Sequence, residues 1–419
     1  MGLYGVMTTS VSGMAAQADR MGTVADNIAN VNTTGYKRAS TEFATLVPEA
    51  RVIEYTPGSV QTVIRRGITE QGGLSYTKSA TDLAINGNGF FMVQSANGAP
   101  YMTRAGSFVP NSAGELVNAA GYKLLGYNLA DGDLSSIVNS AAGLTVVGTA
   151  NLGLRATPST AATMQFNLPS NAAVTAGANL PSANAATASY EGKTSLVTYD
   201  NLGNEVILDL YTAKYVSGTW QVSAYNRADA GPSGSFPYSS AALATTTLSF
   251  DNTTGQLTSS SATTQTVAIP NGGSLVIDFT KSTQLAADYI VQAATVNGNP
   301  PAKVSSLEIS KAGVVTAIYE NGTRVPAFKI PLVNVASPNN LTVLSGNVFS
   351  PNSESGDLQI GIAGTASLGN IVSGALERPT VDLATELTTM VEAQRSYTAN
   401  SKVFQTGSEL LDVLVNLKR

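Results

Sequence analysis

The N-terminal segment of the chain carries an apolar residue at alternating spacings of four and three. Its members are Met7, Val11, Met14, Ala18, Met21, Ala25 and Ile28. A seven-residue apolar repeat is typical of α-helices that pack lengthwise against other helices. We therefore expect a helix from about Leu3 to Asn30, followed by a turn in which Gly35 adopts a positive φ angle.

The C-terminal segment carries a longer stripe with the same average spacing. Its members are Leu383, Leu387, Met390, Gln394, Tyr397, Ser401, Phe404, Ser408, Leu411 and Val415. Pro379 blocks a helix upstream, and Thr380 has the side chain of an N-cap, so we expect the second helix to begin just after it. The three polar members of the stripe either set the register between helices or face water.

Between these two helices the sequence is typical of short strands separated by turns. Glycines divide residues 52–127 into hairpin-sized pieces, and clear alternation of apolar and polar residues returns at 194–199 and after Trp220. We predict an α+β fold that is mostly β, with paired coiled-coil-like terminal helices and nested β-rich domains inserted between them. The predicted domains are a helical core (1–35 and 371–419), a β-rich middle domain (36–145 and 285–370) and an outer β domain (146–284).

Composition excludes many functional classes. The 419 residues include no Cys and no His, which excludes thiol nucleophiles, Ser-His-Asp triads, haem ligation and zinc sites built on these residues. A net charge of −5 argues against general nucleic-acid binding. We find no stretch apolar enough for membrane insertion and no N-terminal pattern of a cleaved signal peptide. No motif indicates an enzyme, a cofactor or a metal site.

The terminal helices are expected to need neighbours. Each apolar side chain of a stripe is worth roughly 1.5–3 kcal/mol when fully buried, whereas ordering a residue costs about 1.5 kcal/mol. One stripe therefore does not stabilise a helix of this length alone. Additional alanines widen the apolar surface of the first helix, which favours contact with more than one neighbour. The alternative is an antiparallel helix pair whose core is private to one monomer.

A longer motif follows the first helix directly. The segment 29–38 resembles the signature of the flagellar rod and hook family, and its motif positions here are Asn30, Asn32, Thr33, Gly35, Tyr36 and Lys37. Residues 82–91 and 101–108 are similar to strands of that family, and 381–419 to its C-terminal helix. The length of the chain favours the hook subunits of the family over the shorter rod subunits. Segments 196–220 and 325–332 also resemble the hook subunits.

This resemblance implies a structural subunit that polymerises with itself into a flexible tube, the universal joint that transmits torque from rod to filament. It implies that the stripe residues form the inner core of the tube. It also implies export through the flagellar type III apparatus without a cleaved signal, an extracellular location in the flagellum, and contacts with the distal rod, the hook cap and the hook–filament junction proteins. The alternatives are a distal rod subunit and, from a different class, a secreted β-rich adhesin or binding module.

Overall fold

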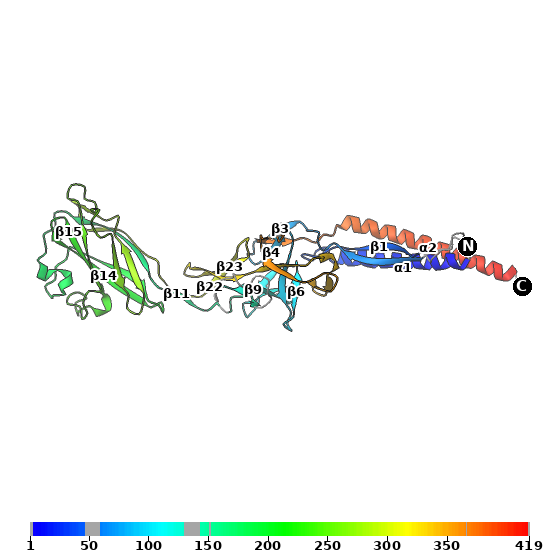
Figure 1. The fold of residues 1–419 in the computed structure, drawn as a ribbon, viewed down its shortest axis with the longest axis horizontal. Coiled ribbons are helices and arrows are strands. Elements are labelled where there is room, and N and C mark those ends of the chain that lie inside the picture. The colour runs from blue at the N-terminus through cyan, green and yellow to red at the C-terminus, as the bar shows by residue number, and fades with distance from the viewer. Residues whose placement is uncertain (1–2, 47–58, 130–142, 151, 366, 418–419) are drawn as a thin grey trace. The chain divides into compact units, whose positions relative to one another are not determined.

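The computed structural model describes residues 3–46, 59–129, 143–150, 152–365 and 367–417. The described chain is mostly β, with one long helix at its N-terminus and another at its C-terminus; the two helices lie side by side (Figure 1). These helices are α1 (Leu3–Ala29) and α2 (Leu383–Leu417). The predicted fold class is therefore confirmed, and the predicted bounds of the first helix are confirmed to within one residue.

The chain divides into two compact units. Unit 1 comprises Met1–Leu152, Ser306–Ala317 and Val325–Arg419, and unit 2 comprises Gly153–Ser305 and Ile318–Arg324. In sequence, the segments of unit 2 thus lie between segments of unit 1. The finer division into three domains stays a prediction.

The start of α2 differs from the predicted one. The carboxylate of Asp382 accepts a hydrogen bond from the backbone N–H of Thr385 at 2.8 Å, so Asp382 is the N-cap of α2. The hydroxyl of Thr380 instead accepts the backbone N–H of Arg38 at 2.9 Å. The prediction of Thr380 as the N-cap was wrong, because a contact distant in sequence occupies its side chain.

Unit 1 also contains several sheets. A hairpin of β1 (Ala39–Leu46) and β2 (Ser59–Arg66) follows α1. The main sheet runs in the order β22-β23-β24-β9-β5-β6-β27-β26, with β7, β8, β10, β25 and β28 attached. Two small ladders join β4 to β29 and β3 to β30. The core of the main sheet includes Phe90, Met92, Met102, Val333 and Phe349.

The bounds of these further strands are β3 (Leu74–Tyr76), β4 (Leu83–Asn86), β5 (Phe90–Gln94), β6 (Pro100–Thr103), β7 (Phe108–Pro110), β8 (Leu116–Asn118), β9 (Lys123–Asn128), β10 (Leu144–Val146), β22 (Val304–Ile309), β23 (Val314–Tyr319), β24 (Arg324–Lys329), β25 (Pro331–Asn334), β26 (Thr342–Leu344), β27 (Val348–Ser350), β28 (Gln359–Ile362), β29 (Asn370–Ser373) and β30 (Ala375–Glu377).

Unit 2 packs two sheets around one apolar core. One sheet has the order β17-β18-β12-β19 with β20 beside β12, and the other has the order β13-β14-β15-β16. Phe166, Leu210, Trp220 and Ile277 lie in the core between them, and the indole N–H of Trp220 donates to Gln284 at 3.0 Å. This core is complete within one chain.

The strands of unit 2 are β11 (Arg155–Thr157), β12 (Ala161–Pro169), β13 (Gly192–Tyr199), β14 (Glu205–Val216), β15 (Thr219–Asn226), β16 (Ala244–Ser249), β17 (Thr264–Ala268), β18 (Ser274–Asp278), β19 (Thr283–Leu285), β20 (Ile290–Val296) and β21 (Asn299–Ala302).

The opposite face of the β13–β16 sheet carries an aromatic cluster with a buried acid. Tyr211, Tyr225, Phe236 and Tyr238 pack together there. The carboxylate of Asp209 accepts a hydrogen bond from Tyr238 at 2.8 Å. Burial alone would raise the pKa of Asp209, but hydrogen bonds from Ser195, Tyr238 and Lys193 bring that pKa below its usual value.

Candidate assembly surface

The helices α1 and α2 lie side by side and run in opposite directions. Gly13 faces Asn400, where an added Cβ would lie 2.9 Å from the side-chain nitrogen. Further along, Arg20 pairs with Glu392 at 3.3 Å. Small and polar residues at this seam, together with Met7 against Gly407, bring the two helices together within one chain.

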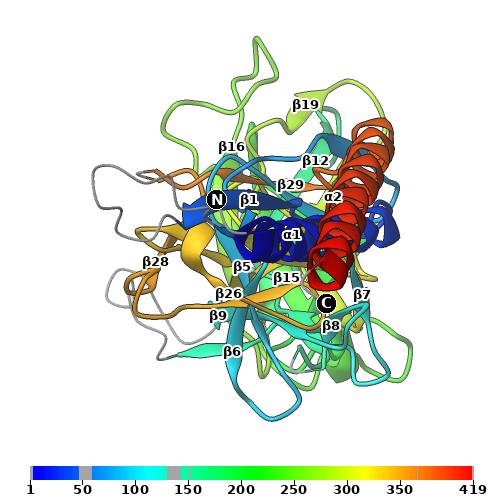
Figure 2. The same cartoon turned by 90° about the vertical axis from the view of Figure 1, so that its right-hand side faces the viewer.

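The β1–β2 hairpin covers a second face of α1. The hydroxyl of Ser12 accepts the N–H of Val60 at 2.8 Å and donates to its carbonyl at 2.9 Å. The amide of Asn27 binds both backbone groups of Ala39, at 2.7 and 3.0 Å. Figure 2, which looks along α1, shows β1 and α2 on two sides of the helix. The contacts of α1 to the hairpin, like those to α2, depend strongly on polar groups.

The predicted apolar stripes are not buried in this seam, although the Met7 side chain lies against Gly407 of α2. No stripe residue is buried within the chain; Val11 is 47% exposed, Leu387 49% and Val415 62%. The exposed members also include Ala18, Ala25, Leu383, Gln394 and Tyr397. The half-buried members are Met7, Met14, Met21, Ile28, Met390, Ser401, Phe404, Ser408 and Leu411.

Further exposed apolar residues on the helices were missed from the sequence. They are Tyr4, Val391, Val403, Leu410, Val413 and Leu414. They fall outside the regular repeat, so spacing alone gives no signal for them. Only the placement of α1 against α2 reveals that they lack cover within the chain.

The first half of the family motif forms the turn that ends α1. The side-chain amide of Asn30 donates to the Asp26 carbonyl at 2.9 Å, and Thr33 donates to the Asn30 side chain at 3.1 Å. Asn32 is exposed. This turn satisfies backbone carbonyls that the helix end leaves open.

The second half of the motif anchors the chain in unit 1. Gly35 has a φ of +66°, as predicted, and its N–H donates to the Glu377 carbonyl at 2.8 Å. The Tyr36 hydroxyl donates to Asn27 at 3.3 Å, and Lys37 forms an ion pair with Glu377 at 2.5 Å. The motif is therefore an internal anchor except at Asn32.

Glu377 is the centre of a buried ion cluster. Besides Lys37, it binds Arg104 at 3.2 Å and accepts the N–H of Gly72 at 2.9 Å. The Lys37 ammonium also donates to the Glu70 carbonyl. Burial lowers the pKa of Lys37, and the Glu377 carboxylate opposes that shift. This pairing leaves no signal in the sequence, because its partners lie far apart along the chain.

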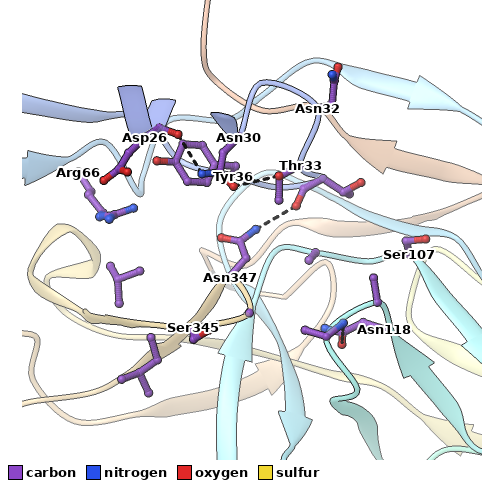
Figure 3. A pocket seen from close by; sticks show the side chains of 17 residues that line it. Asp26, Asn30, Asn32, Thr33, Tyr36, Arg66, Ser107, Asn118, Ser345 and Asn347 are labelled. Carbon is purple, nitrogen blue, oxygen red and sulfur yellow. Dashed lines mark hydrogen bonds between the residues drawn. The ribbon is translucent and has the colours of Figure 1, made fainter. Parts of the chain in front are cut away.

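A hollow of about 930 Å³ lies beside the motif (Figure 3). Its lining includes Asp26, Tyr36 and Arg66, and Asn347 donates across it to the Thr34 carbonyl at 2.9 Å. Amide and hydroxyl groups make up much of the rest. Among the described residues, acidic side chains nowhere gather in threes to hold a metal ion. Neither helix, over its described length, is apolar enough to cross a bilayer.

Family models match most of the chain. The matches are to the flagella basal body rod protein (residues 7–37), the flagellar hook protein FlgE/F/G D1 domain (84–173), the flagellar basal body protein FlaE D2 domain (167–299) and the flagellar basal body rod FlgEFG protein C-terminal region (372–417).

Full-length relatives are similar throughout. The flagellar hook protein FlgE of Brucella suis biovar 1 (strain 1330) is 48% identical over 100% of both chains. That of Rhizobium meliloti (strain 1021) is 47% identical over 100% of both, and that of Salmonella typhimurium is 32% identical over 98% of this chain and 99% of its own. The crystal structure of Helicobacter pylori flagellar hook protein FlgE2 aligns with a TM-score of 0.45 and 14% identity, covering 72% of this chain and 100% of that one.

Proposed function

The chain belongs to the flagellar hook protein family, and from this premise we propose that its terminal helices are the surfaces through which it polymerises. As a hook protein it is a structural subunit of the bacterial flagellum. The proposal concerns which residues carry assembly, and how.

One observation carries the proposal: the regular apolar stripes of α1 and α2 remain exposed or half-buried in the single chain. Tyr397 is 39% exposed and Leu383 45%, although both belong to a strict repeat. A stripe that served only a private helix pair would lie in the seam between α1 and α2. Small and polar residues such as Gly13 and Arg20 contribute to that seam instead, and Met7 is a stripe residue that also contacts α2 there.

The geometry favours several neighbours per helix. Contacts with α2 and the hairpin cover two faces of α1, which leaves Val11, Ala15, Ala18, Gly22 and Ala25 exposed. Small side chains allow another helix to approach closely, and the bulky exposed residues of α2 can fill such a surface. Contacts between two different faces generate rings or open helical polymers rather than closed dimers, and the polymer proposed here is of the open helical kind.

Family membership also supports proposals about what the assembled tube does and how the subunit reaches it. We propose that the polymer is the flexible joint that transmits torque from rod to filament, and that the subunit is exported through the flagellar type III apparatus. Contacts with the distal rod, the hook cap and the junction proteins would form at the ends of the same tube. These roles rest on family membership.

Electron microscopy of polymer grown from the purified full-length protein tests the proposal. We expect curved tubes from the intact chain and none from a variant that ends before Leu383. Straight rigid tubes would indicate a rod subunit instead. Tubes from the truncated variant would contradict assembly through the helices, because that variant lacks α2 entirely.

A further inference from the structure

The segment that follows α1 and the segment that precedes α2 are bound to each other. One segment is 35–38 and the other is 377–380. The N–H of Gly35 donates to the Glu377 carbonyl at 2.8 Å, and the N–H of Thr380 donates to the Tyr36 carbonyl at 3.1 Å. The chain segments at the adjoining ends of α1 and α2 therefore meet in one hydrogen-bonded crossing.

The ion cluster of Lys37, Arg104 and Glu377 lies at this crossing. The side chains of these three residues are at most 3% exposed. They come from the segment after α1, from the loop after β6 and from the end of β30. The cluster thus ties both connecting segments to the main β part of unit 1.

Backbone contacts make the crossing tight. A Cβ at Gly35 would lie 2.7 Å from the backbone carbon and oxygen of Arg104, and one at Gly72 would overlap the Arg378 carbonyl. The segments can therefore not slide past one another without separating. A second anchor lies next to the crossing, where the buried Glu386 of α2 binds Arg38 at 2.5 Å and Asn27 at 3.2 Å.

A buried ion cluster is a poor means of adding stability. Removing charges from water costs several kcal/mol per ion, and well-packed apolar residues of similar volume are often equally or more stabilising. Charged groups with fixed hydrogen-bond directions do, however, favour one relative arrangement of the chain segments that they join over other arrangements. We propose that the Lys37–Arg104–Glu377 cluster is a positioning device that fixes the direction in which the helix pair leaves the β-rich part. This inference rests on the proposed function: in a polymer assembled through the helices, the direction of the helix pair sets the helical lattice of the tube.

The test is a double variant, Lys37→Met with Glu377→Gln, which removes a cation and an anion and keeps side-chain size. We expect unchanged Trp220 fluorescence, because Trp220 lies in unit 2, and loss of the wild-type helical lattice in images of the polymer. The matched control is Arg65→Met with Glu42→Gln, an ion pair at 3.0 Å whose side chains are 68% and 57% exposed. We expect this control to keep the wild-type lattice.

The pattern of outcomes separates the two proposals. If the double variant forms fewer tubes but these keep the wild-type lattice, the cluster only stabilises the fold. That outcome would overturn the inference and leave the proposed function intact. Absence of tubes from the wild-type protein would overturn the proposed function and the inference with it. If the double variant does not fold, Arg104→Lys replaces it, since this change keeps the buried charge of the cluster and removes the fixed fork of N–H donors that faces Glu377. A wild-type lattice in that variant would also overturn the inference.

Discussion

The helix pair and unit 2 differ in how completely they bury their large apolar side chains. In unit 2 the large apolar side chains are inside, with Trp220 and Phe166 at most 1% exposed. In α1 the buried positions combine polar Ser10, Thr23 and Asn27 with Ala16 and Val24, while much of the apolar surface of the helix pair remains accessible. One region is complete within a single chain, and the other leaves its strongest apolar pattern uncovered.

This difference indicates where each region obtains its stability. Burial of apolar surface is the main favourable contribution to folding, so unit 2 can draw it from its own core. The helix pair must gain it from further contacts, which a polymer supplies. Polar contacts within the pair then position the helices rather than provide most of the free energy.

The largest expected effect is on assembly, through Met21→Asp. Met21 is half-buried on the apolar stripe of α1, and a carboxylate there would lose its water in the polymer without gaining a partner. We expect tube formation to be abolished, as measured by sedimentation and electron microscopy, while the fluorescence of Trp220 stays unchanged.

The matched control introduces the same charge on unit 2. Val174 is 57% exposed, and we expect Val174→Asp to leave tube formation intact. Normal tubes from Met21→Asp would show that the stripe is not at an intersubunit contact, and the contrast between the two regions would lose its functional meaning.

An intermediate effect is expected from Phe166→Ala in the core of unit 2. Phe166 is 1% exposed and packs against Phe279 with ring centroids 5.6 Å apart. Loss of the ring should lower the free energy of unfolding of unit 2 by about 3–5 kcal/mol. Denaturant unfolding followed by Trp220 fluorescence measures this. Below the unfolding transition we expect tubes to form, because the helices are unaltered.

Val276→Ala is the control for that experiment, since Val276 is 40% exposed on a neighbouring strand. Its effect should be within about 0.5 kcal/mol, as for other surface substitutions. Equal effects of the two changes would contradict a self-contained core in unit 2.

The regular parts of the fold were predictable because their signals are local. The apolar repeat gave α1, and the positive φ of Gly35 followed from the turn after it. The helix N-cap was not predictable, because Thr380 and Asp382 are both good caps and the choice depends on Arg38, far away in sequence. Local patterns cannot resolve such a competition.

The candidate site shows the same limit. The stripes were visible in the sequence, but the seam that pairs α1 with α2 was not, because Gly13, Arg20 and Asn27 form no apolar pattern. The partners of Lys37 were equally hidden, since Arg104 and Glu377 reach it only after the chain has folded. Long-range polar contacts leave little trace in one sequence.

The smallest expected effect concerns the polar cover of α1, through Ser12→Ala. The Ser12 hydroxyl binds both backbone groups of Val60, so its loss leaves an N–H and a carbonyl of β2 without that partner. We expect the hairpin to loosen from α1 by roughly 1 kcal/mol, seen as several-fold faster hydrogen exchange at the Val60 amide. Ser40→Ala is the control, because Ser40 neighbours Ala39 on β1 and its side chain points to the opposite face of the hairpin. Equal exchange in both variants would mean that the hairpin is held by something other than its polar contacts with α1, and the proposed division of labour between polar positioning and apolar assembly would need revision.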